Sequence, residues 1–140
     1  MPEFILDHGS EEGSYWLSGL DEFACGYVEA MFFTSTGYAE NGDLEHASVA
    51  ELSEMARRKI IADCKAFQEK HAEDLAIAYG IDDYDSEKAG RDFWYTRNGH
   101  GVGYWDRDLN EVGDKLTDAA HAFGEVDLYR GDDGDLYLSP

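Results

Sequence analysis

The feature that most constrains the fold is a helical repeat of apolar residues between Ser48 and Gly80. Along this segment apolar side chains recur every three or four residues, which is the spacing of one buried face of an α-helix. Ser48 and Glu51 fit a capping box at its start, and Gly80 fits its end. The pattern predicts a single helix of about thirty residues, near 45 Å long. Its inward-facing positions are Val49, Leu52, Ala56, Ile60, Cys64, Phe67, His71, Leu75 and Ala78.

Three shorter helices are predicted around it. Ser18 and Asp21 fit a capping box that opens a helix of about fifteen residues ending at Phe33. Asp85 or Ser86 can cap a second, which ends near Asn98 and Gly99, where glycine supplies a left-handed residue. The third begins at Asp108 with Glu111 and is closed by Gly124.

The C-terminal segment has the alternating pattern of a β-hairpin. Residues 126–129 and 136–138 alternate around a Gly-Asp-Asp-Gly turn,. Two strands alone are marginal in water, and Phe4 to Leu6 is the one candidate for a third. The prediction is therefore a mainly helical α+β fold, with a small C-terminal β-hairpin or a three-stranded sheet. Residues 1–140 are expected to form one acidic globular domain, with a flexible acidic loop from Ser35 to Glu45.

The charge of the chain limits its partners. Its 31 Asp and Glu against 11 Lys and Arg give a formal net charge of -20 over 140 residues. Because hydrophobic residues make up 43% and aromatic residues 14%, we expect a folded core rather than an acidic tail. Such a domain is roughly 35–40 Å across, and B-DNA of that length carries on the order of twenty phosphate charges. The surface should repel nucleic acid and membranes and attract basic grooves.

A partner that normally grips phosphates is thus the first to consider. Its Lys and Arg side chains would meet exposed carboxylates on the loops and helix faces. The carboxylates expected to stand in for phosphates are Asp43, Glu45, Glu51, Glu54, Asp82, Asp83 and Asp85.

The densest group of chemically versatile side chains lies between Asp92 and Arg107. In one interpretation His100 is an acid or base oriented by Asp106 or Asp92, while Arg97 and Arg107 hold an anion. In the other, the glycines form tight turns, the aromatic residues anchor the core, and the Arg and Asp side chains form local ion pairs. The second interpretation is favoured, because the glycine spacing is not a nucleotide-binding fingerprint.

Catalytic and metal-binding motifs are not found. No Gly-x-Ser-x-Gly elbow occurs, and the five histidines have no spacing typical of metal ligands,. The sequence predicts a protein that is not an enzyme and that binds no metal or cofactor. Cys25 and Cys64 lie on apolar helical faces and are predicted to be buried, reduced thiols. With no membrane-spanning or signal-peptide pattern, the expected location is the cytoplasm of a bacterial host.

Two runs give the chain a resemblance to a known family. Residues 90–101, continuing through Tyr104-Trp105-Asp106-Arg107, and residues 124–129 with the Gly131 to Gly134 turn, resemble small acidic proteins carried by bacteriophages and mobile elements. The resemblance covers about residues 63–138 and carries over no functional residue. It implies a mobile-element origin, where small acidic proteins often disarm host restriction or CRISPR machinery.

Together these features predict an anti-defence protein that mimics DNA and occupies the phosphate-binding groove of a host restriction or CRISPR complex. One alternative is a small enzyme or ligand-binding module centred on Arg97, His100, Asp106 and Arg107. Another is a phage structural or assembly protein, for which the long helix offers a homodimer seam.

Overall fold

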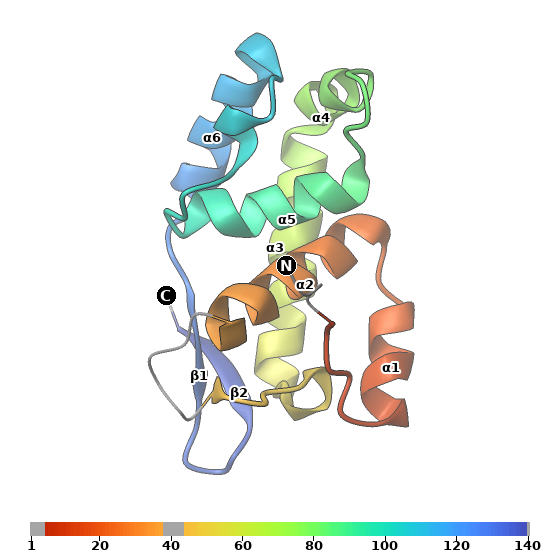
Figure 1. The fold of residues 1–140 in the computed structure, drawn as a ribbon, viewed down its shortest axis with the longest axis vertical. Helices are drawn as coiled ribbons and strands as arrows, with labels where there is room; N and C mark the ends of the chain where they lie inside the picture. The colour runs from red at the N-terminus through yellow and green to blue at the C-terminus, as the bar shows by residue number, and fades with distance from the viewer. Residues whose placement is uncertain (1–4, 38–43, 140) are drawn as a thin grey trace.

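The computed structural model describes residues 5–37 and 44–139, which are mainly helical with a small C-terminal antiparallel sheet (Figure 1). This confirms the predicted fold class. The elements are α1 (Glu11–Ser18), α2 (Glu22–Gly37), η2 (Val49–Glu51), α3 (Glu54–Lys70), α4 (Ala72–Tyr79), α5 (Ser86–Arg97), η3 (Tyr104–Asp106), α6 (Asn110–Ala122), β1 (Asp127–Arg130) and β2 (Leu136–Ser139).

The helices are arranged around α3. Figure 1 shows α2 and α5 crossing in front of α3, with α4 and α6 at one end of the molecule and α1 and the hairpin at the other. The contact between α2 and α5 is the most extensive between any two elements. Two glycines allow it: a methyl group at Gly26 would lie 2.0 Å from the Glu87 carbonyl oxygen, and one at Gly90 would lie 1.8 Å from that of Phe23. The two helix backbones therefore touch at this crossing.

The aromatic residues fill the core where these helices meet. Phe67 of α3 stacks on Phe93 of α5 with ring centroids 4.2 Å apart, and Phe23 of α2 lies 5.9 Å from Phe67. Tyr104 is fully buried beside them, 6.0 Å from Phe67. The buried apolar residues form one contiguous cluster across the described chain, which fits a single domain,.

The prediction of one long helix was wrong. The capping box exists, since Glu51 accepts a hydrogen bond from the Ser48 N–H at 2.9 Å, but it opens only the short turn η2. Ser53 caps α3 instead, accepting from the Ala56 N–H at 3.1 Å. At His71 the backbone leaves helical geometry (φ -118°, ψ 29°), and α4 begins. This break lets Leu75 and Ala78 be buried while α4 packs against α6.

The N-terminal prediction was also wrong in part. Residues 11–18 form α1, which Ser10 caps by accepting from the Gly13 N–H at 3.2 Å. Ser18 ends this helix, and Asp21 alone caps α2 by accepting from the Ala24 N–H at 2.8 Å. Asp85 caps α5, as one of the two predicted alternatives, with the Lys88 N–H at 2.9 Å.

The hairpin is confirmed, with Tyr129 paired to Tyr137 across an antiparallel ladder. In the described residues it has no third strand from the N-terminus: Phe4 lies outside them, and Ile5 and Leu6 are not in a strand. An isolated parallel bridge between Leu52 and Leu136 and a hydrogen bond from the Ser53 N–H to the Leu136 carbonyl oxygen (2.9 Å) join β2 to the segment before α3.

Both cysteines are free thiols whose pKa values are raised chiefly by burial. Cys64 is buried as predicted, whereas Cys25 is only partly buried.

Candidate functional site

Arg97, predicted to hold an anion, is a core residue that is 3% exposed. Its Nε and Nη2 donate to the carbonyl oxygens of Gly124 (2.8 Å) and Phe123 (3.0 Å) at the end of α6. Its Nη1 donates to Asp63 Oδ2 at 2.9 Å and to the Tyr27 hydroxyl at 3.1 Å. Arg97 thus joins α2, α3, α5 and α6, and its donors are used inside the fold.

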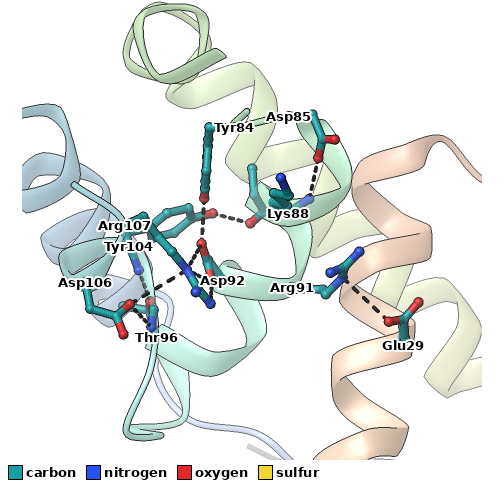
Figure 2. A network of polar contacts seen from close by, with 12 residues as sticks. Glu29, Tyr84, Asp85, Lys88, Arg91, Asp92, Thr96, Tyr104, Asp106 and Arg107 are labelled. Carbon is teal, nitrogen blue, oxygen red and sulfur yellow. Dashed lines mark hydrogen bonds and ion pairs between the residues drawn. The ribbon is translucent and has the colours of Figure 1, made fainter. Parts of the chain in front are cut away.

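Arg107 belongs to a different network, centred on a buried carboxylate (Figure 2). Asp92 is 1% exposed, and both its oxygens accept hydrogen bonds from Arg107 at 2.9–3.1 Å. The Tyr84 hydroxyl donates to Asp92 Oδ2 at 2.7 Å. Burial raises the pKa of Asp92, and the bonds from Arg107 and Tyr84 partly oppose that shift,. The network ties α5 to the segments on either side of it.

Next to Asp92 the chain forms a pocket of about 330 Å³. Figure 2 shows Tyr84 and Arg107 approaching Asp92 from its two sides, with Lys88 on the same helix. The Lys88 Nζ donates to the Asp83 carbonyl oxygen at 2.7 Å. The pocket is lined by Ile81, Asp82, Asp83, Tyr84, Lys88, Arg91, Asp92, Arg107 and Asp108.

Of the other two residues of the candidate loop, Asp106 belongs to the Asp92 network, with its Oδ1 3.7 Å from Arg107 Nε, whereas His100 lies apart from both networks. His100 is half-buried, its ring 6.0 Å from that of Tyr95, and burial lowers its pKa. Asp106 Oδ1 accepts from the Gly103 N–H at 3.1 Å, which closes the turn at η3. Arg97, His100 and Arg107 therefore do not point toward a common centre.

The predicted acidic residues fall into two groups at opposite ends of the molecule, and Asp43 lies outside the described residues. Glu45 is exposed before η2, and Glu54 is exposed at the start of α3, paired with Arg58. Glu51 accepts from Arg130 of β1. Burial favours its neutral form, but the bonds from Arg130 and Ser48 hold the pKa of Glu51 below its ordinary value. The second group, Asp82, Asp83 and Asp85, lies exposed between α4 and α5.

Further carboxylates surround this second group. Glu111, Asp114 and Asp118 are exposed on α6, and at 100° per residue they lie within a sector of about 60° on one helix face,. Helix α4 packs against α6 and begins with Glu73 and Asp74. We call the whole set the anionic end: Glu73, Asp74, Asp82, Asp83, Asp85, Asp108, Glu111, Asp114 and Asp118.

The α6 carboxylates are not among the partner-binding acids predicted from the sequence, where Glu111 is assigned only to the start of a helix. The signal was present as acids three and four residues apart on a helix whose opposite face is apolar,. Asp108, next to the helix, has a left-handed backbone (φ 57°) and lines the pocket with Asp82 and Asp83.

Several positive charges are paired away from the anionic end, whereas Lys88, Arg91 and Arg107 line the same pocket as Asp82, Asp83 and Asp108, and Lys115 lies on α6 beside its carboxylates. Arg57 binds Glu12, Lys59 binds Asp63, and Lys65 binds Glu69. In the part of the chain that the structure describes, no carboxylate of the anionic end forms an ion pair with Lys or Arg. Its negative charge is therefore left for solvent or a partner.

Two features are absent from residues 5–37 and 44–139, namely a cluster of metal ligands and a membrane-spanning helix. No group of three or more His, Cys, Asp or Glu side chains there is arranged to hold a metal ion. None of the helices in these ranges has the length and apolar character needed to cross a membrane. No protein-family model, curated protein or solved structure matches the chain.

Proposed function

We propose that this chain is a non-enzymatic anti-defence protein of a phage or mobile element. In this proposal it acts in the cytoplasm of a bacterial host, where it occupies the phosphate-binding groove of a restriction or CRISPR complex in place of DNA. The mobile-element origin rests on the resemblance of residues 63–138. The mode of action rests on the structure's charge distribution.

The observation that carries the proposal is the collection of unpaired carboxylates at the anionic end. Elsewhere some carboxylates are neutralised within the protein, as in the Glu54–Arg58 and Glu51–Arg130 pairs, whereas others at the hairpin end, such as Asp127 and Asp132, have no Lys or Arg partner among the described residues. An ion pair already made inside the protein must open before either group can bind a partner, whereas an unpaired, solvated carboxylate can attract a cation directly. We expect a basic groove to be drawn to this end of the molecule, where three of the carboxylates form a row on one face of α6,.

The spacing along α6 supports the same conclusion. With a rise of 1.5 Å per residue, Glu111 and Asp114 are separated by about 4.5 Å along the helix axis, and Asp114 and Asp118 by about 6 Å. One strand of B-DNA carries a phosphate every 3.4 Å along its axis. The row therefore has somewhat more than half the linear charge density of a strand, and Asp108 extends it beyond the N-terminus of α6.

The position of the first carboxylates of this α6 row, at the start of the helix, also stabilises their negative charge. Asp108 and Glu111 lie at the N-terminal end of α6, where the helix dipole stabilises negative groups,. A groove of Lys and Arg would meet fixed backbone positions on a helix rather than charges on a loop.

The proposal predicts a partner that also binds duplex DNA. The tagged chain should be incubated with host lysate at about 50 and 200 mM salt, and each retained protein then challenged with a duplex oligonucleotide. Because the contact is made by charges, retention should fall by about tenfold or more at the higher salt. The retained protein should be released by duplex DNA. Retention that is equal at both salt concentrations, or that duplex DNA does not reverse, would refute the proposal.

A further inference from the structure

The outer face of α3 carries a pattern that the fold does not use. Ala56, Ile60, Cys64 and Phe67 are buried, so the opposite face of the helix is turned to solvent. In Figure 1 this helix lies behind α2 and α5. The residues along the centre of that face recur at intervals of three and four, the spacing of a helix-pair seam. They are Met55, Arg58, Ala62, Lys65 and Glu69, all exposed.

Apolar and small side chains mark the same face. Met55 is 73% exposed and Ile61 is 44% exposed. Ala62 and Ala66 lie between the charged residues and leave the backbone open to close approach. A helix from another molecule could therefore pack on α3 without displacing any residue of the core.

The charge of α3 is opposite to that of the whole protein. The helix holds five of the 11 Lys and Arg residues and only three acids, Glu54, Asp63 and Glu69. A second copy of a protein with a net charge of -20 is repelled by most of the surface,. It is repelled least at α3, where charges of both signs alternate along the exposed face.

We propose that two copies associate through the outer faces of their α3 helices, antiparallel about a two-fold axis. In the register that follows from the spacing, Arg58 lies opposite Glu69 of the second copy. Ala62 then lies opposite Lys65 of the second copy, whose apolar stem packs over the small residue. Two-fold symmetry repeats each of these contacts.

The antiparallel arrangement follows from the anionic end. Helix α3 runs from the hairpin end toward α4, so parallel helices would bring the two anionic ends together. Antiparallel helices hold them at opposite ends of the dimer, where their mutual repulsion is screened within about 10 Å at 0.1 M salt.

The charged residues are free to rearrange into the new pairs. Within one copy Arg58 binds Glu54 and Lys65 binds Glu69, but both pairs lie on exposed side chains and contribute little to stability,. Arg58 can therefore contact Glu69 of the second copy without loss to the fold.

Reversing the charge of Arg58, of Glu69 and then of both residues together tests the proposed contact between them. Sedimentation equilibrium should show that the wild-type protein is a dimer. Arg58→Glu and Glu69→Arg should each raise the dissociation constant of the dimer by about tenfold or more, because two symmetric contacts become repulsive. The double variant R58E/E69R should restore the wild-type value. Circular dichroism checks that each variant is folded.

The two single variants change the net charge in opposite directions, so a general charge effect would strengthen one dimer and weaken the other. Lys115→Glu on α6 is the matched control, with the same change of charge as Arg58→Glu at a distance from α3, and it should leave the dissociation constant within about twofold of wild type.

The proposal is overturned if the wild type is a monomer at about 1 mM, a concentration well above the range of specific association. It is also overturned if Glu69→Arg tightens the dimer, if the double variant fails to restore it, or if Lys115→Glu weakens it as much as Arg58→Glu does.

Discussion

At the scale of single residues, two charged side chains, Arg97 and Asp92, are buried in the described part of the chain, and each is satisfied differently. Arg97 is buried among carbonyl oxygens, a tyrosine hydroxyl and one carboxylate, Asp63. Asp92 is buried against a single arginine and a tyrosine. Because burial penalises the ionised form, the pKa of Asp92 is raised even with Arg107 beside it,.

This buried carboxylate should give the fold a measurable pH dependence. With a folded-state pKa above the unfolded value, the native protein binds more protons than the unfolded chain, so Asp92 contributes more stability as the pH falls through its folded pKa. The variant Asp92→Asn lacks this titration. We expect it to lower the free energy of unfolding at pH 7 by about 1–3 kcal/mol, since Arg107 loses its charged partner but remains partly exposed,.

Chemical denaturation at several pH values measures both effects. The difference in unfolding free energy between wild type and Asp92→Asn should grow as the pH falls from 7 toward 4. A difference that stays constant or shrinks over that range would show that burial does not raise the pKa of Asp92 in the folded protein.

At the scale of elements, the fold depends on the crossing of α2 and α5. Gly26 and Gly90 let the two backbones approach so closely that a methyl group at either position meets a carbonyl oxygen. Backbone atoms cannot move aside as a flexible side chain does. The crossing therefore sets the positions of Phe23 and Phe93 in the core and of Asp92 above it.

Substitution at this crossing should be severe. Gly90→Ala is expected to lower the free energy of unfolding by about 3 kcal/mol, because the added methyl group forces the helices apart. Gly101→Ala is the matched control, since nothing lies within 4 Å of the added methyl group there, and it should be nearly neutral. Thermal or urea unfolding compares the two. Equal stability of both variants would mean that the helices do not touch at Gly90.

Sequence patterns predicted those elements whose apolar spacing or turn residues are visible within the segment itself. The apolar spacing of α2, α3, α5 and α6 and the Asp-Gly turn of the hairpin are such cases. The break at His71 was not predictable, because apolar residues keep their phase through Leu75 while the backbone changes direction. Helix α1 was missed because it has only eight residues, buries only Gly13 and lies in a segment punctuated by glycine and serine.

The candidate site was predictable only in part for a related reason. Exposed acids such as Asp82 and Asp83 could be identified from composition and loop context, and the structure places them at the anionic end. Their neighbours on α6 come from a segment about thirty residues away, and only the packing of α4 against α6 shows that they share one end of the molecule. The partners of Arg97 come from three other elements and have no local signal.

At the scale of the whole molecule, unbalanced negative charge opposes folding. Many of the 31 acidic residues have no ion-pair partner among the described residues, and like charges repel one another in the compact state,. Screening by salt reduces that repulsion more than it weakens the few exposed ion pairs.

Stability should therefore rise with ionic strength. We expect the unfolding temperature to increase by several degrees between about 20 and 300 mM sodium chloride, over which the screening length falls from roughly 20 Å to roughly 6 Å. Differential scanning calorimetry measures this. An unfolding temperature that falls with salt would show that ion pairs outweigh repulsion in this protein.

The same charge, gathered at the anionic end, is the proposed basis of function. The most direct test compares the affinity of two triple variants for the retained DNA-binding partner. Glu111→Gln, Asp114→Asn and Asp118→Asn together neutralise the α6 row. Glu45→Gln, Asp127→Asn and Asp132→Asn remove the same charge from exposed positions at the hairpin end. We predict that the first variant raises the dissociation constant at least about tenfold, while the second changes it less than about threefold. Equal losses in both, or a loss only in the second, would contradict the account.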